Sequence, residues 1–485
     1  MREKLPLFII ILIGILPLFF IWTIEYLPFT DYPNHLVRAN IIKLYEDSEL
    51  YRKYFTVNFF NGPLPIPNII FDLFATKLLP FIHVDTAGKI FLSLYVLLSL
   101  LSLLLLCREV NADTETVLLG YLPIIYGLFF NMALLNYIFS IPLVIFSITV
   151  LLKFQQKSKN SYIIIFIILL VLVYLSHLFS FFILSLILIF YSFFSLGKRK
   201  PLLYVLASFC FIAIVIYLMR DDFFMQQHPF GIKYKLHLLS LYFLSYPVNY
   251  VDYNLGMLIL ISYSLGLLWL LIRLILKNRK IFILILVLFI IYLLLPFSGT
   301  SGTLVDARIL PFIVLLILIS SGSKEKYKRV ILVILFGIAL SIKAYGSFVY
   351  YSAFLNNFPK VMGCIDKIEM RALLLPVVSM DESNINAYTH AWGYAVLKKD
   401  IIVPYIFAGK YQPLKYRHNL FAPSPLWGYN KTYDEPKAFW DNLKNTYDYV
   451  LIFGRNEKLK MAVEEIGYKA VCGTEISTLY ERLET

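Results

Sequence analysis

The chain has 485 residues, of which 59% are hydrophobic and only 15% are charged. Soluble domains carry about 25% charged residues, so this composition excludes an ordinary soluble protein. The net charge of +13 would suit nucleic acid, but the basic residues gather in short gaps between long apolar blocks, at 153–159, 198–200, 273–280 and 324–329. This pattern is typical of the cytoplasmic loops of membrane proteins and argues against nucleic acid as a partner.

The N-terminal apolar segment predicts a first membrane span over residues 5–22, with the N-terminus in the cytoplasm. A signal peptide is the alternative, but the segment is long for one and no small-x-small cleavage site follows it. Residues 25–85 then form a first extracytoplasmic loop. Within this loop, residues 33–54 predict an amphipathic helix that rests on the membrane interface, and residues 68–81 predict a short apolar helix.

Further apolar blocks follow the loop, and with the first they make about 11 spans. In lipid each span must be helical, because only a helix satisfies its own backbone polar groups. Alternation from a cytoplasmic N-terminus puts the basic clusters inside the cell, and it puts the turns at 131–136 and His177 and the loops at 220–252 and 297–306 outside. The later spans are expected near residues 86–107, 116–131, 137–152, 161–175, 179–196, 201–218, 254–276, 281–296, 307–320 and 330–345.

The composition changes to polar after Tyr345. Residues 372–378 and 449–454 predict buried strands, and residues 438–446 and 457–466 predict helices. Alternation of this kind indicates a small α/β unit with a parallel sheet.

The expected fold is therefore mostly α, a polytopic helical membrane protein with a small α/β C-terminal domain. Residues 1–345 form the membrane domain, and an odd number of spans places residues 346–485 outside the cell. Cys364 and Cys472 both fall in this outer domain and are candidates for a disulfide.

Asp31, His35 and Arg38 lie just beyond the first span, on the outer face. Pro33 favours a helix start, so Asp31 is at the helix cap and the other two follow at near one-turn spacing. A carboxylate, an imidazole and a guanidinium then share one side of the first turns. The alternative is that Asp31 only caps the helix and that Arg38 reaches lipid headgroups.

Residues 30–36, with the sequence Thr-Asp-Tyr-Pro-Asn-His-Leu, are similar to an Asp-x-x-x-His variant of the C-type superfamily of membrane glycosyltransferases (GT-C). The whole chain resembles that superfamily in its many spans, its long first outer loop with an amphipathic helix, and its soluble C-terminal domain. The resemblance implies inverting transfer of a sugar from a polyprenyl-phosphate donor to a lipid, glycan or protein acceptor. The loop lacks an Asp-x-Asp pair, which leaves open whether a divalent metal, Mg²⁺ or Mn²⁺, is used.

The resemblance implies that Asp31 is the general base or a metal ligand, and that His35 orients Asp31 or the acceptor. The leaving phosphate needs cations, and Arg308 at the outer start of a span is the first candidate, with Arg38 as a second. Asp306 and His177 are candidates for supporting roles. The alternatives are that Asp306 and Arg308 form an ion pair at the membrane interface and that His177 is a turn residue. Local sequence assigns no role to His83, His237, His390 and His418.

Two rival functions share the same donor. A transporter or flippase of lipid-linked sugars would use the outer basic residues for binding only, and an oligosaccharide polymerase or ligase would concentrate its charge in a later outer loop. Transporters often contain internal repeats and ionisable groups near the membrane midplane. This sequence contains no evident repeat and its charges lie mostly at span ends, which favours the enzyme.

Overall fold

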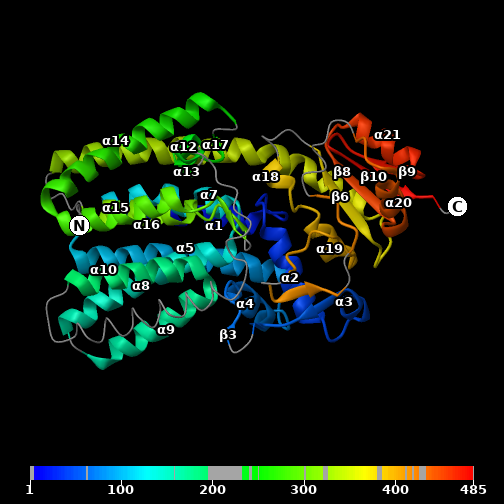
Figure 1. Cartoon of the computed structure of the whole chain (residues 1–485). Helices are drawn as coiled ribbons and strands as arrows, with labels where there is room; N and C mark the ends of the chain where they lie inside the picture. Colours follow the sequence, from blue (N-terminus) through cyan, green and yellow to red (C-terminus); the bar gives the residue numbers. More distant parts are fainter. Residues whose placement is uncertain are drawn as a thin grey trace.

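A computed structural model describes residues 5–61, 64–157, 159–194, 232–239, 243–248, 251–299, 302–320, 326–379, 385–409, 412–417, 420–424 and 433–483. A bundle of long helices forms one end of the molecule and a small α/β domain forms the other (Figure 1). The bundle contains α1 (Leu5–Thr23), α5 (Val84–Val110), α6 (Thr114–Ile125), α7 (Leu128–Asn131), α8 (Leu135–Lys157), α9 (Asn160–Ser176), α10 (Leu178–Phe194), α14 (Tyr253–Lys277), α15 (Arg279–Leu294), α16 (Leu310–Ser320) and α17 (Lys326–Ile365).

In the described residues, five helices are long and apolar enough to cross a membrane, namely α1, α5, α8, α14 and α17. Helix α14 exposes Leu258, Ile261, Leu265 and Leu268, which are spaced three or four residues apart and form one apolar face. An apolar helical face that is not covered by protein is suited to lipid contact. The chain is a multi-pass membrane protein, as the composition predicts.

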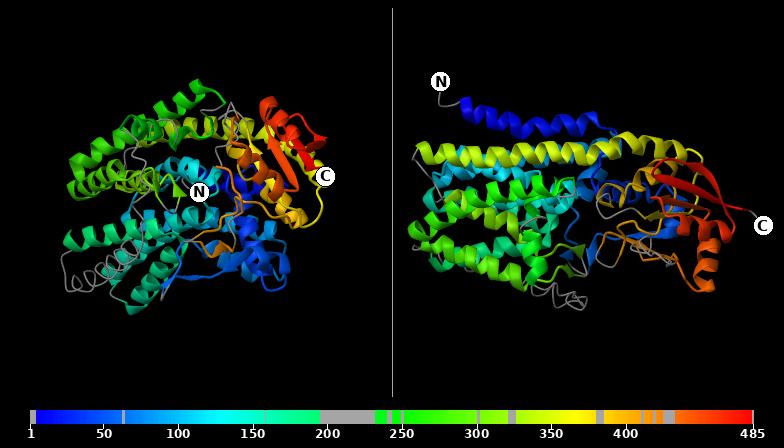
Figure 2. Two further views of the ribbon diagram at one scale, coloured as in Figure 1. Left: turned by 45° about the vertical axis from the view of Figure 1, so that its right-hand side comes forward. Right: turned by 90° about the horizontal axis from the view of Figure 1, so that it is seen from above.

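The predicted spans agree with helices of the structure, except that 201–218 lies outside the described residues. The span expected at 116–131 is divided into α6 and α7 by a break at Tyr126 and Gly127. Helix α17 continues through the predicted domain boundary at residue 345 and ends at Ile365, close to the C-terminal domain (Figure 2). One continuous helix therefore connects the membrane bundle to that domain.

The first loop contains α2 (Tyr32–Leu44), α3 (Glu49–Tyr54), α4 (Ile70–Leu78) and the short strands β1 (Phe55–Val57), β2 (Phe60–Asn61) and β3 (Leu64–Pro65). The single helix expected over 33–54 is two helices, because the chain turns after α2 and Ser48 caps α3 by accepting a hydrogen bond from the backbone N–H of Tyr51. The first two turns of α2 are buried, and α2 packs against α4, α5 and α19 (Gly393–Lys399). Helix α2 is thus enclosed by protein there, whereas the sequence pattern predicts a helix resting on the membrane interface.

The C-terminal domain contains a four-stranded sheet in the order β6 (Leu374–Val378), β8 (Tyr449–Phe453), β10 (Ser477–Arg482) and β9 (Tyr468–Gly473). Strands β6 and β8 are parallel, whereas β10 pairs antiparallel with both β8 and β9. The sheet is mixed, so the expectation of a parallel sheet is correct only for its first pair. Helices α20 (Lys437–Thr446) and α21 (Glu457–Glu465) agree with the predicted ones.

A disulfide and a strand pairing are among the connections that fasten this domain to the rest of the chain. Cys364, at the end of α17, forms a disulfide with Cys472 of β9. Strand β7 (Leu414–Tyr416) pairs antiparallel with β1 of the first loop. The smaller elements of the chain are α12 (Ile232–His237), α13 (Phe243–Ser245), β4 (Ser298–Gly299), β5 (Gly302–Thr303), the 3-10 helix η3 (Ala307–Ile309) and α18 (Ile385–Tyr388).

Candidate active site

Asp31 lies where the first loop meets the turn that joins α7 to α8. Its backbone N–H donates to the carbonyl of Met132 at 2.9 Å, and the N–H of Thr30 donates to the carbonyl of Asn131 at 3.4 Å. Asp31 directly precedes α2, yet its side chain makes no capping hydrogen bond to that helix. The carboxylate is therefore not occupied by the capping role that the sequence leaves open as an alternative.

A titratable residue from the C-terminal half of the chain lies beside Asp31. Nε2 of His390 lies 3.4 Å from Oδ1 of Asp31. The side-chain amide of Asn34 lies 3.1 Å from the other ring nitrogen, Nδ1 of His390. An amide N–H can only donate, so Nδ1 accepts and the ring proton is on Nε2, the nitrogen that lies 3.4 Å from Asp31.

Asn34 uses its remaining hydrogen-bonding capacity to hold the same C-terminal segment. It donates to the carbonyl of Tyr405 at 2.9 Å and accepts from the N–H of Phe407 at 2.8 Å. This buried amide therefore fixes both the ring of His390 and the backbone beside it. Satisfied buried polar groups of this kind specify one arrangement, because leaving any of them unpaired is costly.

Burial determines the protonation of this pair. It raises the pKa of Asp31 from 3.8 to about 7, although the positive charge of Arg308 acts in the opposite direction. Burial lowers the pKa of His390 from 6.5 to about 4. His390 is therefore neutral near pH 7, while Asp31 changes charge in the physiological range, as a general base should.

His35, the expected partner of Asp31, is placed differently. Its backbone N–H donates to the carbonyl of Asp31 at 3.0 Å within α2, but its ring lies edge-on to the rings of Phe71 and Phe407. His390 contacts the Asp31 carboxylate instead. Asn34 and His390 are 356 residues apart in the sequence, so no local motif indicates this contact.

Arg308 is buried, and its positive charge acts to lower the pKa of Asp31. Its Nη1 lies 3.1 Å from Nε2 of His177, and its guanidinium lies 5.6 Å from the ring centroid of Tyr137. The Tyr137 hydroxyl donates to the carbonyl of Arg308 at 2.6 Å. The structure thus brings together three residues that the sequence analysis selects separately, namely Asp31, His177 and Arg308.

Asp306 does not form the interfacial pair with Arg308 that the sequence leaves open. Its Oδ2 lies 2.5 Å from Nζ of Lys235, and its Oδ1 accepts from the N–H of Ala307. Lys235 also donates to the carbonyl of Tyr292 at 3.1 Å. Asp306 therefore fixes the start of the helical segment that carries Arg308.

Arg38 forms a fork with Asp72 of α4, with Nε to Oδ1 at 2.8 Å and Nη2 to Oδ2 at 2.7 Å. Its Nη1 donates to Oε1 of Gln412 at 2.7 Å. Both charged side chains are buried. Burial raises the pKa of Asp72, and the adjacent guanidinium opposes that rise. The guanidinium of Arg38 thus joins the first loop to the C-terminal domain.

Several buried polar atoms around this cluster have no hydrogen-bond partner among the residues that the structure describes, including Oγ1 of Thr30, Oγ of Ser176 and Nδ1 of His177. Buried polar groups are normally paired, so such atoms fit a site that binds a polar ligand. Among the described residues, no group of three or more His, Cys, Asp and Glu side chains is placed to hold a metal ion. The positive charge of Arg308 acts on the Asp31 carboxylate.

Comparison with known proteins gives matches among solved structures alone. No protein-family model matches the chain, and no curated protein matches it in sequence. The crystal structure of ArnT from Cupriavidus metallidurans in the apo state is 10% identical, with a TM-score of 0.46 over 100% of this chain and 99% of that one. The crystal structure of ArnT from the same organism bound to undecaprenyl phosphate is also 10% identical, with a TM-score of 0.47 over 99% of this chain and 98% of that one.

Proposed function

We propose that this protein is a membrane glycosyltransferase that transfers a sugar from a polyprenyl-phosphate donor, with Asp31 as the general base. The observation that carries the proposal is the carboxylate of Asp31 itself. It is free of any capping bond, has a pKa of about 7, and lies within the electrostatic reach of the buried cation Arg308. Perturbed titratable groups opposite a buried cation are typical of catalytic sites.

In the proposed reaction, the acceptor hydroxyl oxygen attacks the anomeric carbon of the donor sugar and forms the new glycosidic bond. The bond between the anomeric carbon and the phosphate oxygen breaks, and its electron pair leaves with polyprenyl phosphate. The hydroxyl proton moves to the carboxylate of Asp31. Because one displacement occurs at the anomeric carbon, we expect inversion of its configuration.

Arg308 is the proposed partner of the donor phosphate. A guanidinium offers donors in a planar fork that matches phosphate oxygens, and it stays charged when buried. Tyr137 and His177 both contact this side chain, which reduces the reorganisation needed when charge develops on the leaving phosphate.

His390 and Asn34 are proposed as positioning residues. We propose that the Nε2–H of His390, which lies 3.4 Å from Asp31, donates to the ionised carboxylate, while Asn34 keeps the ring in that tautomer. The proton that leaves the acceptor hydroxyl is therefore taken up by Asp31 and not by the imidazole of His390. The acceptor is a hydroxyl compound, whether lipid, glycan or protein.

The test uses the full chain reconstituted in vesicles with a polyprenyl-phosphate sugar labelled in the sugar. Two quantities are measured together, namely release of polyprenyl phosphate and movement of the intact lipid-linked sugar between leaflets. Because the donor is unidentified, a panel of sugars is used, with a membrane extract as the source of acceptors.

We expect release of polyprenyl phosphate that depends on the extract, together with transfer of label to an extract component. Movement of the intact lipid-linked sugar with no cleavage would identify a flippase and refute the proposal. Transfer of whole oligosaccharides in preference to single sugars would favour the polymerase or ligase alternative. Arg308→Lys should weaken use of the donor while leaving the thermal unfolding temperature of the protein unchanged.

A further inference from the structure

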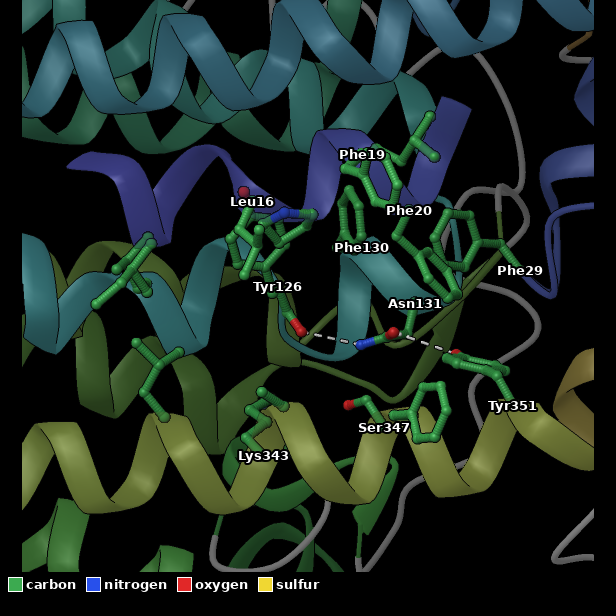
Figure 3. A pocket seen from close by; sticks show the side chains of 17 residues that line it. Leu16, Phe19, Phe20, Phe29, Tyr126, Phe130, Asn131, Lys343, Ser347 and Tyr351 are labelled. Carbon is green, nitrogen blue, oxygen red and sulfur yellow. Dashed lines mark hydrogen bonds between the residues drawn. The ribbon is translucent and has the colours of Figure 1, made fainter. Parts of the chain in front are cut away.

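The side-chain amide of Asn131 joins α17 to the break between α6 and α7. Asn131 is the last residue of α7 and is buried. Its Nδ2 donates to the carbonyls of Tyr126 and Gly127, at 2.9 and 2.8 Å. Its Oδ1 accepts from the hydroxyl of Tyr351 in α17 at 3.1 Å. Figure 3 shows this amide between Tyr126 and Tyr351, so both of its ends are engaged.

The backbone at Asn131 supports the segment that contains Asp31. The carbonyl of Asn131 accepts the N–H of Thr30 at 3.4 Å, and the carbonyl of Met132 accepts the N–H of Asp31 at 2.9 Å. Ala133, the next residue, has a φ of +50°, in the left-handed region that is unfavourable for a residue other than glycine. A turn of this kind persists only where surrounding contacts hold it. The position of the Asp31 backbone therefore depends on the contacts that hold this turn.

Tyr351 contacts the first loop as well as this turn. Its ring lies edge-on to the ring of Phe29, with 6.1 Å between the centroids, and Phe29 is two residues before Asp31. Both aromatic side chains are buried. One residue of α17 thus contacts the loop on one side of Asp31 and the turn that accepts its backbone N–H.

A cavity of about 440 Å³ lies beside this pair, between α1, the α6–α7 segment and α17 (Figure 3). Asn131 and Tyr351 both line it, together with apolar side chains such as Leu16, Phe20 and Phe130. Because both polar side chains border this space, packing alone does not fix them. The hydrogen bond between them therefore has a larger share in setting their positions.

We propose that Tyr351 and Asn131 are positioning residues, whose hydrogen bond holds the turn that orients Asp31 toward the acceptor hydroxyl. This inference rests on the proposed function, because it takes Asp31 as the base. Within the described part of the chain, the Tyr351 hydroxyl is the donor to Oδ1 of Asn131, and a buried acceptor without a donor is costly. Loss of this hydroxyl would let the turn shift and the carboxylate move with it. A displacement of about 1 Å at a reacting group can cost about 10²-fold in rate.

Tyr351→Phe removes the hydroxyl and keeps the ring. We expect kcat for sugar transfer to fall about 10- to 100-fold, with the KM for the donor unchanged, because Arg308 is the proposed partner of the donor phosphate. Asn131→Ala should also lower kcat, and the double variant should fall no further than Asn131→Ala alone, because both changes break the same hydrogen bond. Tyr345→Phe, at an exposed position of the same helix, is the matched control and should keep the wild-type kcat.

Hydrogen–deuterium exchange gives a second readout that does not depend on transfer. The backbone N–H groups of Thr30 and Asp31 donate to the turn, so their exchange rates report whether it stays in place. In the purified full chain in detergent, we expect these two amides to exchange about 10-fold faster in Tyr351→Phe than in wild type. The amides of α15 should keep their wild-type rates.

Unchanged exchange at Thr30 and Asp31 in Tyr351→Phe would overturn the inference. Faster exchange throughout the protein, α15 included, with kcat unchanged would also overturn it, because Tyr351 would then be merely structural. So would effects on kcat that add in the double variant. If the wild-type protein shows no transfer while exchange at these two amides responds as expected, the proposed function fails and the support of Asp31 by this turn stands.

Discussion

Replacing Asp31 with asparagine separates the catalytic role from the structural one. The two side chains have nearly the same size, and asparagine caps helices about as well as aspartate. The change removes the charge and the basicity of the carboxylate. A positioned base contributes about 10²–10⁴ to a rate, so we expect transfer to fall by roughly 10²-fold or more while the donor still binds.

The same substitution has a calculable effect on stability. The rise in the pKa of Asp31 from 3.8 to about 7 corresponds to about 4 kcal/mol for ionising this carboxyl in the folded protein. The folded state binds more protons than the unfolded state between these two values, so the wild-type protein loses stability as pH rises from 4 to 7. An asparagine side chain does not titrate, so Asp31→Asn should unfold at a higher temperature than wild type at pH 8 and at a similar one at pH 4.

The assay pairs transfer from a polyprenyl-phosphate sugar with thermal unfolding of the same detergent-purified samples at both pH values. Lost activity in a protein that is equally or more stable supports a catalytic carboxylate. Full activity in Asp31→Asn would remove this residue from the mechanism. Lost activity together with a lower unfolding temperature at pH 8 would mean that Asp31 is structural.

The remaining predictions concern the C-terminal domain and its attachment. A Cβ added at Gly393 would lie 2.8 Å from the Cβ of a proline in α2, so Gly393→Ala should destabilise the protein by about 1–3 kcal/mol. Gly409→Ala is the control and should not destabilise it, because a Cβ there meets nothing within 4 Å. Equal unfolding temperatures of the two variants would contradict this packing. Cys364→Ser should lower the free energy of unfolding by about 2–5 kcal/mol, because it removes the disulfide with Cys472. A reductant should destabilise the wild-type protein by a similar amount and should leave the variant unchanged. A wild-type protein that is insensitive to reductant would argue against the disulfide. In intact cells, an impermeant thiol reagent should label a cysteine introduced at Lys458 but not a cysteine introduced at Lys157. If the cysteine at position 458 is not labelled, the C-terminal domain lies in the cytoplasm.

The membrane part of the fold could be predicted from the sequence because the lipid environment limits the choices. A long apolar block in a bilayer has to be a helix, so the pattern identifies α5, α8 and α14 without knowledge of their neighbours. The buried strands β6 and β8 were equally predictable, since both are short apolar runs bounded by polar segments. The order of strands in the sheet was not, because β10 and β9 follow β8 in sequence yet β10 lies between the other two.

The candidate site could be predicted only for residues whose own position in the sequence marks them. Asp31 and Arg308 are distinguished by charge at the ends of spans, and in the structure the charge of Arg308 acts on the Asp31 carboxylate. The contact of His390 with Asp31 depends on the C-terminal segment folding back over α2, and no spacing in the sequence reports that contact. Burial of α2 has the same cause, since its pattern of polar and apolar residues does not reveal whether protein or a membrane surface covers it.

The most direct test of the central claim is the pH dependence of kcat/KM for sugar transfer by the wild-type protein, because this ratio reports ionisation in the free enzyme. Asp31 accepts a proton only when it is ionised, and His390 stays neutral above pH 5. We therefore predict that kcat/KM rises with pH, with an apparent pKa of about 7, and reaches a plateau at higher pH. A value of kcat/KM that is the same at pH 5.5 and pH 8.5, or that falls over this range, would contradict the assignment of Asp31 as the base.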